Sequence, residues 1–242
     1  MYGVSLLIAF SPIGEWVLCR LNKARKLKTK EEYECLMPLF EEVYSNALRV
    51  NSNLNRGITL KIIDDITINA FAFSRTVAVT MGALETLSED ELKGVISHEF
   101  GHIANGDTKA LLLSTIGNGV FSLIFVLLRL IFNVLTFIFA LTNTGAYLLP
   151  KVLGHIVNFI QRIWNYIGKV ILSINSRYNE FQADKFAYKM GYGGNLLEAL
   201  YFLKKINMNN DMSFTDKLKS THPHITDRIG NLEYLVYSNG IN

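Results

Sequence analysis

The sequence predicts an α+β protein that is mostly helical, holds a small three-stranded sheet and carries membrane-associated helices. Three observations predict this fold. Short β-type runs follow one another between residues 57 and 81. A capped segment with helical apolar spacing begins at Ser88. A long, almost uncharged stretch then fills residues 111–149.

The composition agrees with a chain that is partly in a membrane. Half of the 242 residues are hydrophobic and 19% are charged, below the usual level of about 25%. The mean hydropathy is +0.21, and the apolar excess is concentrated in a few stretches. Cys19 and Cys35 have no metal-binding or redox spacing, which argues against a disulfide framework. The length allows one large domain or two small ones.

The amino-terminal residues 1–19 form the first candidate membrane segment. Their apolar part has at most about 18 residues, the lower limit for a span, so it is a short membrane or interfacial segment, or alternatively a buried core helix. A basic cluster follows, which is either a solvated linker or a positive-inside signal that faces anionic headgroups. Its members are Arg20, Lys23, Arg25, Lys26, Lys28 and Lys30. The second interpretation places the next part of the chain in the cytoplasm. We expect no nucleic-acid binding, because no aromatic platform accompanies these charges.

The next elements are a helix and three strands. Residues 29–50 have an amphipathic pattern, with a break or kink expected at Pro38. Residues 57–63, 66–73 and 76–81 alternate or are β-branched, so they are predicted strands, and Asp64-Asp65 is a predicted turn.

The motif His98-Glu99-Phe100-Gly101-His102 carries the chemistry. On a helix its two histidines lie one turn apart on one face, where both imidazoles can bind one zinc ion. Glu99 lies near the same face and can take a proton from water as a general base. This HExxH pattern is the zincin motif. Ser88 as N-cap and Glu91 in a capping box favour a helix here, whereas the alternative is a surface helix with two incidental histidines.

The stretch after the motif predicts membrane helices. Residues 119–141 would span about 35 Å as a helix, with Arg129 in the middle, so they form a membrane span or a buried hairpin. Residues 152–174 are amphipathic, with Trp164 and Tyr166 as possible interface anchors. This second helix either packs against the first or lies on the membrane surface. His155 is interpreted as a polar-face residue, since it has no partner at ligand spacing.

A zinc site of this kind needs one more protein ligand. Glu180 and Asp184 are four residues apart and share a helix face. Glu180 is the candidate ligand, and Asp184 is a candidate acceptor that orients a ligand imidazole. By itself this spacing is common on solvated helix faces.

The motifs HEFGH, RYNEFQAD and THPHITDR, in this order, resemble the HtpX-like membrane zinc metallopeptidases, a gluzincin family that also includes the CAAX prenyl proteases. INAFAF and the segment leading into HEFGH match the same pattern, so the resemblance covers residues from about 58 to 235. It implies a zincin-like metallopeptidase fold with one Zn²⁺ per chain, bound by His98, His102 and Glu180, with Glu99 as the base. It also implies Asp184 and Arg228 as supporting residues, His222 as the transition-state stabiliser, and Asn69 and Ala70 beside the substrate backbone. Asn69 is equally well explained as a turn or bulge residue.

The resemblance also gives a domain arrangement. Residues 20–110 and 175–242 are the two parts of the catalytic domain, and residues 111–174 are a membrane helical insertion. Residues 1–19 are part of an amino-terminal membrane segment, which is longer in HtpX-type members of the family.

The expected function is that of a membrane-bound zinc endopeptidase. We expect it in the cell membrane as a multi-pass protein, with its active site facing the cytoplasm and with misfolded membrane proteins as substrates in stress response. Two alternatives remain: a CAAX-type processing protease, and a non-catalytic, zinc-stabilised membrane scaffold or chaperone.

Overall fold

The computed structural model describes residues 12–54, 56–73, 75–142, 145–209 and 225–238. The chain divides into two compact units. Unit 1 comprises residues 1–14 and 111–174, and unit 2 comprises residues 15–110 and 175–242. The described part is mostly helical, as predicted, and its strands form one small mixed sheet. All of the predicted site residues in the described part lie in unit 2.

Unit 2 contains the sheet, whose strands are β1 (Ala24–Arg25), β2 (Thr59–Ile63), β3 (Ala70–Phe73) and β4 (Thr76–Thr80). The strand order is β1-β2-β4-β3, with β2 and β4 parallel and the outer pairs antiparallel. The prediction of three strands was therefore one short. A two-residue strand such as β1 has no periodic pattern to detect. It is held instead by the Arg25 guanidinium, which binds Asp64 at the end of β2 and Glu32 of the next helix at 2.7 Å each.

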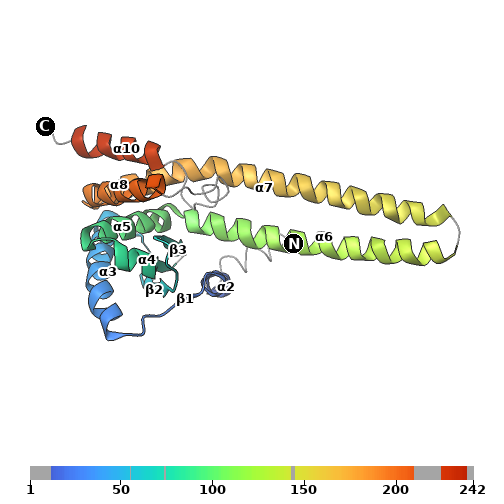
Figure 1. Cartoon of the computed structure of the whole chain (residues 1–242), viewed down its shortest axis with the longest axis horizontal. Coiled ribbons are helices and arrows are strands. Elements are labelled where there is room, and N and C mark those ends of the chain that lie inside the picture. Colours follow the sequence, from blue (N-terminus) through green and yellow to red (C-terminus); the bar gives the residue numbers. More distant parts are fainter. Residues whose placement is uncertain (1–11, 55, 74, 143–144, 210–224, 239–242) are drawn as a thin grey trace. The chain divides into compact units, whose positions relative to one another are not determined.

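Helix α3 (Lys30–Val50) is continuous through Pro38, so the break that was one of the two expectations there does not occur. It begins with a capping box in which the Thr29 hydroxyl accepts from the Glu32 amide, while the Glu32 carboxylate accepts from the Thr29 amide. Its apolar face includes Leu36, Phe40 and Val43, all buried in the main core. α3 therefore encloses the core shared with the sheet and with helix α5 (Glu89–Asn105), as Figure 1 shows.

The remaining helices of unit 2 complete this core. Helix α4 (Met81–Thr86) follows β4 directly, and the Thr80 hydroxyl caps it by accepting from the Ala83 amide. Helix α8 (Gly193–Asn209) packs against α5, and helix α10 (Ile225–Ser238) packs against α8 around Leu196, Leu200 and Leu232. Gly94 allows the α5–α8 contact, because a Cβ there would lie 2.4 Å from the Leu196 amide nitrogen. Helix α2 (Pro12–Leu21) precedes the sheet.

Unit 1 is a helical hairpin formed by parts of α6 (Asp107–Leu141) and α7 (Leu148–Lys189), with a short 3₁₀ helix η1 (Gly145–Tyr147) near its turn (Figure 1). Arg129 of α6 donates to the Asn158 side chain of α7 at 3.3 Å. Phe121 and Trp164 pack with ring centroids 4.6 Å apart. Of the two positions that the sequence allowed for residues 152–174, the structure shows the packed hairpin, and Arg129 faces its partner helix.

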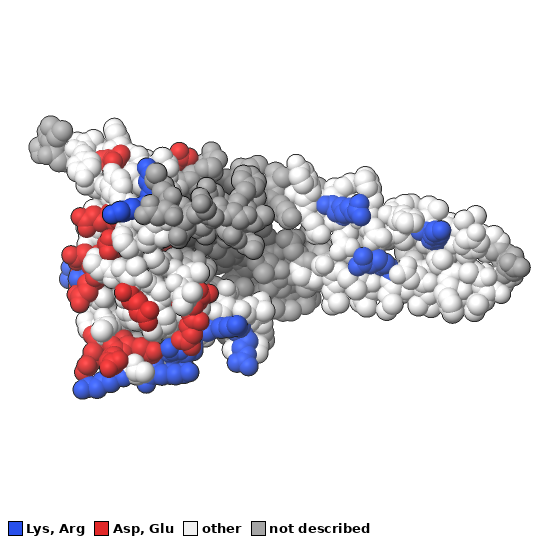
Figure 2. All heavy atoms as spheres, in the orientation of Figure 1, with Lys and Arg blue, Asp and Glu red and all other residues white. Residues whose placement is uncertain are grey.

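Within the described residues, one helical segment is long and apolar enough to cross a membrane. It comprises residues 121–141 and has a mean hydropathy of 2.5 over its most apolar window, none of which is buried. This assignment is based on length and composition. No acidic residue occurs between Asp107 and Glu180, and unit 1 in Figure 2 accordingly shows a few basic side chains and no acidic ones.

Candidate metal centre

Helix α5 presents the two histidines of the motif. The predicted capping box is confirmed: Ser88 accepts from the Glu91 amide, and the Glu91 carboxylate accepts from the Ser88 amide. The helix ends at Gly106, whose φ of +79° is a left-handed conformation that glycine adopts without strain. Between these caps the side chains of His98 and His102 turn to the same side, and their Nε2 atoms are 3.1 Å apart.

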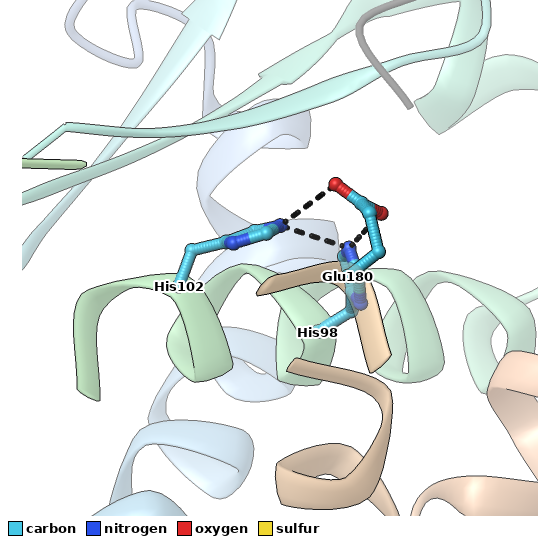
Figure 3. A group of neighbouring side chains, drawn as sticks. All are labelled: His98, His102 and Glu180. Atoms are coloured by element: carbon cyan, nitrogen blue, oxygen red, sulfur yellow. Dashed lines mark hydrogen bonds and ion pairs between the residues drawn. The ribbon is translucent and has the colours of Figure 1, made fainter. Parts of the chain in front are cut away.

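Helix α7 brings Glu180 to these two nitrogens, although 78 residues of sequence separate it from His102. One carboxylate oxygen lies 3.4 Å from His98 Nε2 and the other lies 3.5 Å from His102 Nε2. Figure 3 shows the carboxylate above the two imidazoles, with the nitrogen and oxygen atoms converging. His98 and Glu180 are buried, with 3% and 4% of their surfaces exposed. The three side chains therefore form a closed cluster of ligand atoms from two helices.

These separations fit a single zinc ion. With ligand bonds of about 2.0 to 2.1 Å, two donors at the corners of a tetrahedron around zinc are roughly 3.3 to 3.4 Å apart. The observed separations of 3.1, 3.4 and 3.5 Å lie close to this value. Two imidazoles and one carboxylate are also the donor set of many catalytic zinc sites, which leave the fourth position open. The residues present thus fit the ion that the motif implies.

Two further carboxylates orient the histidines. Asp184, one turn after Glu180 on α7, has its Oδ1 2.8 Å from His98 Nδ1. Asp107, the first residue of α6, has its Oδ2 3.0 Å from His102 Nδ1. A carboxylate acceptor at Nδ1 keeps the proton on that nitrogen and leaves the Nε2 lone pair free for a metal. With a metal bound at Nε2, these carboxylates would therefore hold both imidazoles in the tautomer that a metal ligand requires.

Arg228 of α10 ties the two acidic residues of α7 together. Its Nε and Nη2 donate to the two oxygens of Asp184 at 2.9 and 2.7 Å, and its Nη1 lies 3.0 Å from Glu180 Oε2. Only 4% of Arg228 is exposed. Burial alone would raise the pKa of Asp184, but the Arg228 charge and the hydrogen bond from His98 lower it below its usual value. Asp184 therefore stays ionised as an acceptor.

The cluster carries an excess of negative charge. Burial lowers the pKa of His102, but hydrogen bonds to Asp107 and Glu180 and the charge of Glu99 raise it by more, to about 10. Four carboxylates, those of Glu99, Asp107, Glu180 and Asp184, thus belong to the cluster. Among the described residues they face one buried guanidinium, that of Arg228. Uncompensated buried charge is costly, so the site favours a bound cation.

A pocket adjoins the histidines and holds the rest of the predicted site. His98, Glu99 and Arg228 line it together with Asn69 and Ala70, and the other lining side chains are apolar. The apolar ones are Ile68, Ala83, Leu87, Val95, Leu196, Leu200 and Leu203. Ala70 begins β3, which pairs with β4 on one side and with no other strand in the described residues, so β3 is an edge strand of this sheet. The Asn69 side-chain oxygen accepts from the Ala70 amide at 2.9 Å, which fixes the backbone where the strand begins.

The position of the predicted site residues can be stated for all but one. His98, His102, Glu180, Asp184 and Arg228 form one contact network, and Glu99, Asn69 and Ala70 line the adjoining pocket. His222, expected as the transition-state stabiliser, lies outside the described residues.

Asp107 was missed by sequence reasoning, which assigned it no role in the site. The signal in the sequence was an acidic residue five positions after His102, just beyond the glycine that ends the helix.

The site has the ligand set and the adjoining pocket of a metal-dependent peptidase, and comparisons with known proteins agree. The family model described as Peptidase family M48 matches residues 39–236. The chain belongs to peptidase family M48.

Three relatives, each named "Protease HtpX homolog", show the extent of the likeness. The protein from Bacillus licheniformis is 26% identical, over 88% of this chain and 73% of its own length. The protein from Neisseria meningitidis serogroup C is 30% identical, over 69% of this chain and 62% of its own. The protein from Tropheryma whipplei is 30% identical, over 76% of this chain and 69% of its own length. The chain is thus an HtpX-like protease, as the motifs predicted, and it spans roughly three fifths to three quarters of these relatives.

Proposed function

We propose that this chain is a membrane-bound zinc endopeptidase that hydrolyses peptide bonds with an activated water molecule. The observation that carries the proposal is the convergence of His98, His102 and Glu180 at zinc-ligand separations, beside a pocket that Glu99 lines. Membership of a peptidase family supplies the reaction class.

His98, His102 and Glu180 would hold one zinc ion. When bound, such an ion lowers the pKa of a coordinated water towards neutrality and polarises a carbonyl oxygen. Asp184 and Asp107 keep the Nδ1 protons in place, so that both Nε2 lone pairs point to the ion. Glu99 accepts a proton from the attacking water and delivers it to the leaving amine nitrogen. Outside the described residues, we assign His222 to donate a hydrogen bond to the developing oxyanion, a contribution of several kcal/mol.

The edge strand and the pocket supply substrate binding. A peptide in extended conformation can add to β3 at the edge where no other strand of the described residues pairs, and Asn69 and Ala70 line the same pocket as His98 and Glu99. The apolar side chains of Leu87, Leu196, Leu200 and Leu203 would receive an apolar side chain of that peptide. Unfolded proteins expose such side chains in extended segments. These features support unfolded segments of proteins as substrates. We further propose misfolded membrane proteins as the substrates, in quality control during stress.

The location rests on two features. Residues 121–141 have the length and hydropathy of a membrane span. Residues 20–30 carry six exposed or half-buried basic side chains beside the amino-terminal apolar segment, which favours the cytoplasmic side for the catalytic domain. We place the chain in the cell membrane as a multi-pass protein, with residues 111–174 as the membrane insertion. Of the predicted segment 1–19, residues 1–14 are proposed as a further membrane segment, because Glu15 and Cys19 pack in unit 2.

Metal analysis and proteolysis of an unstructured protein, such as casein, test the proposal. Purified protein should contain one zinc per chain and lose casein cleavage on chelation. Glu99→Gln should keep zinc and lose cleavage, because the ligands remain while the base is removed. Glu180→Ala should lose most of the zinc. Full cleavage by Glu99→Gln, or unchanged zinc in Glu180→Ala, would refute the assignments.

The same assay separates the alternatives. A non-catalytic scaffold would bind zinc but leave casein intact with and without chelator. A CAAX-type processing protease would cleave prenylated carboxy-terminal peptides in preference to casein. The mixed polar and apolar pocket beside an edge strand favours a general endopeptidase over both.

A further inference from the structure

The amino-terminal face of unit 2 combines exposed apolar and exposed basic side chains. Trp16 and Leu21 of α2 are 64% and 69% exposed, and Ile66, in the turn after β2, is 92% exposed. Arg20, Lys23, Lys26 and Lys28 are also exposed. We call these seven residues the α2 face. In Figure 2, Lys and Arg side chains follow the lower edge of unit 2, over the region where Figure 1 shows α2, β1 and the start of α3, with Asp and Glu side chains directly above them.

This face is built by the fold and is not a loose basic tail. Cys19 of α2 is buried, and Glu15 accepts from the Thr76 hydroxyl of β4 at 2.7 Å, so one side of α2 is fixed on the sheet. At 100° per residue, Arg20 and Leu21 then lie on the outward half of the helix, and Trp16 lies on its flank, where it is exposed.

The following segment is fixed as well. Arg25 bridges Asp64 and Glu32, and Leu27 is buried in the main core. Lys26 and Lys28, on either side of Leu27, therefore point outward. No ion pair joins Lys23, Lys26 or Lys28 to another residue in the described ranges.

We propose that the α2 face binds an anionic phospholipid surface. Tryptophan and aliphatic side chains enter the headgroup boundary, and each lysine or arginine near an anionic surface adds attraction. A protein partner would need shape complementarity for its contacts, whereas a lipid surface needs only protruding apolar groups within a field of positive charge. The α2 face has this composition. Membrane location is the part of the proposed function on which this inference rests.

The two tryptophans of the chain, Trp16 and Trp164, allow the test to be made on the full chain. Trp164→Phe leaves Trp16 as the single reporter of the α2 face, and Trp16→Phe leaves Trp164 as the reporter of the hairpin. Both proteins are reconstituted in nanodiscs of phosphatidylcholine, or of phosphatidylcholine mixed with phosphatidylglycerol, with or without brominated acyl chains. Quenching of tryptophan emission by bromine reports contact with the bilayer.

Trp16 should be quenched more strongly in discs that contain phosphatidylglycerol, and added salt should reduce this difference, because salt screens exposed charges. Trp164 should be quenched equally in both lipids. In the Trp16 reporter, Lys26→Gln with Lys28→Gln should remove most of the dependence on phosphatidylglycerol. The matched control, Lys189→Gln with Lys205→Gln, neutralises two exposed lysines elsewhere on unit 2 and should keep it.

The outcomes separate the two proposals. Quenching of Trp164 with none of Trp16, or Trp16 quenching that does not depend on phosphatidylglycerol, would overturn the α2 face while leaving the membrane location intact. No quenching of either tryptophan would overturn both. Neither measurement uses proteolysis, so loss of the peptidase mechanism would not change the result.

Discussion

Gly101 of α5 lies directly against the backbone of Ala183 in α7. A Cβ at position 101 would be 2.6 Å from the Ala183 Cα and 2.8 Å from its carbonyl oxygen, closer than real Cβ contacts come. Gly101 stands next to His102, and Ala183 stands next to Asp184. The close approach of the two backbones is therefore what brings the acidic residues of α7 within reach of the histidines of α5.

Gly101→Ala should loosen the metal centre without removing any ligand. The added methyl group must push the helices apart, and overpacking of this kind typically costs about 1 to 3 kcal/mol. We expect a lower melting temperature and a lower zinc content. Gly230→Ala is the control, because Gly230 is exposed on α10 and an added Cβ there would have nothing within 4 Å. It should be neutral or slightly stabilising. Unchanged zinc affinity in Gly101→Ala would show that the helix spacing does not set the site.

Glu32→Gln should make stability less dependent on pH. Hydrogen bonds from Arg25 and from the Lys28 amide lower the pKa of Glu32 from 4.5 to about 2. A lowered pKa means that the ionised carboxylate stabilises the fold fully above pH 4.5 and that this contribution is lost as pH falls towards 2. The melting temperature of the variant should lie below that of the wild type at pH 7, and the gap should narrow below pH 4.5.

Chelator should be present throughout the Glu32 measurement, so that metal loss does not enter. Glu41→Gln removes an exposed carboxylate from the same helix and should leave the pH dependence unchanged. A constant gap between Glu32→Gln and the wild type at all pH values would mean that the Arg25–Glu32 pair does not hold β1 to α3.

Asp107→Asn should weaken zinc binding by about 10- to 100-fold, the usual effect of losing a carboxylate that orients a histidine ligand. The amide can present its NH₂ group to His102 Nδ1 and so favour the wrong tautomer. Competition with a chelator of known affinity measures the change. Asp90→Asn makes the same chemical change at an exposed site in the first turn of α5 and should leave zinc affinity unchanged. Equal affinities for both variants would remove Asp107 from the positioning role.

The site residues that sequence predicts and those that it misses differ in how local their signal is. The spacing of His98 and His102 is a property of one helix, as is the Ser88 cap, so both can be derived without tertiary structure. Asp107 reaches His102 only because Gly106, in a left-handed conformation, ends α5 and a new helix begins at Asp107, and the motif does not specify where the carboxylate then points. The role of Asp107 is visible only in the three-dimensional structure.

The same reasoning applies to the fold. Strands β2 to β4 have β-branched or alternating runs and were predicted, although their observed bounds are shorter. β1 has two residues and depends on ion pairs from Arg25 to Glu32, seven residues away, and to Asp64, 39 residues away, so no local pattern marks it. Helix α7 continues for 42 residues from Leu148 to Lys189. The sequence pattern predicted an amphipathic helix over residues 152–174 and a helix face shared by Glu180 and Asp184, but it did not show that both belong to one helix.

Asp184→Asn and Arg228→Met should both destabilise the protein but have opposite effects on the charge at the metal. Each breaks a buried ion pair, for which a loss of about 3 to 5 kcal/mol is typical. Asp184→Asn also removes the acceptor for His98 Nδ1 and should reduce zinc affinity about 10- to 100-fold. Arg228→Met instead removes a positive charge 3.0 Å from Glu180 Oε2, which repels a cation, so its zinc affinity should fall much less or rise.

Melting temperature and zinc competition, measured on the same samples, distinguish the two effects. If Arg228 acted only by holding Glu180 in place, Arg228→Met would lose zinc as severely as Asp184→Asn does. If Arg228 acts instead through its positive charge, which repels a cation, the two variants will be similar in stability and different in zinc affinity. The second result is expected, because the ion, once bound, itself fixes the Glu180 carboxylate, whereas nothing else in the described site replaces the acceptor at His98 Nδ1.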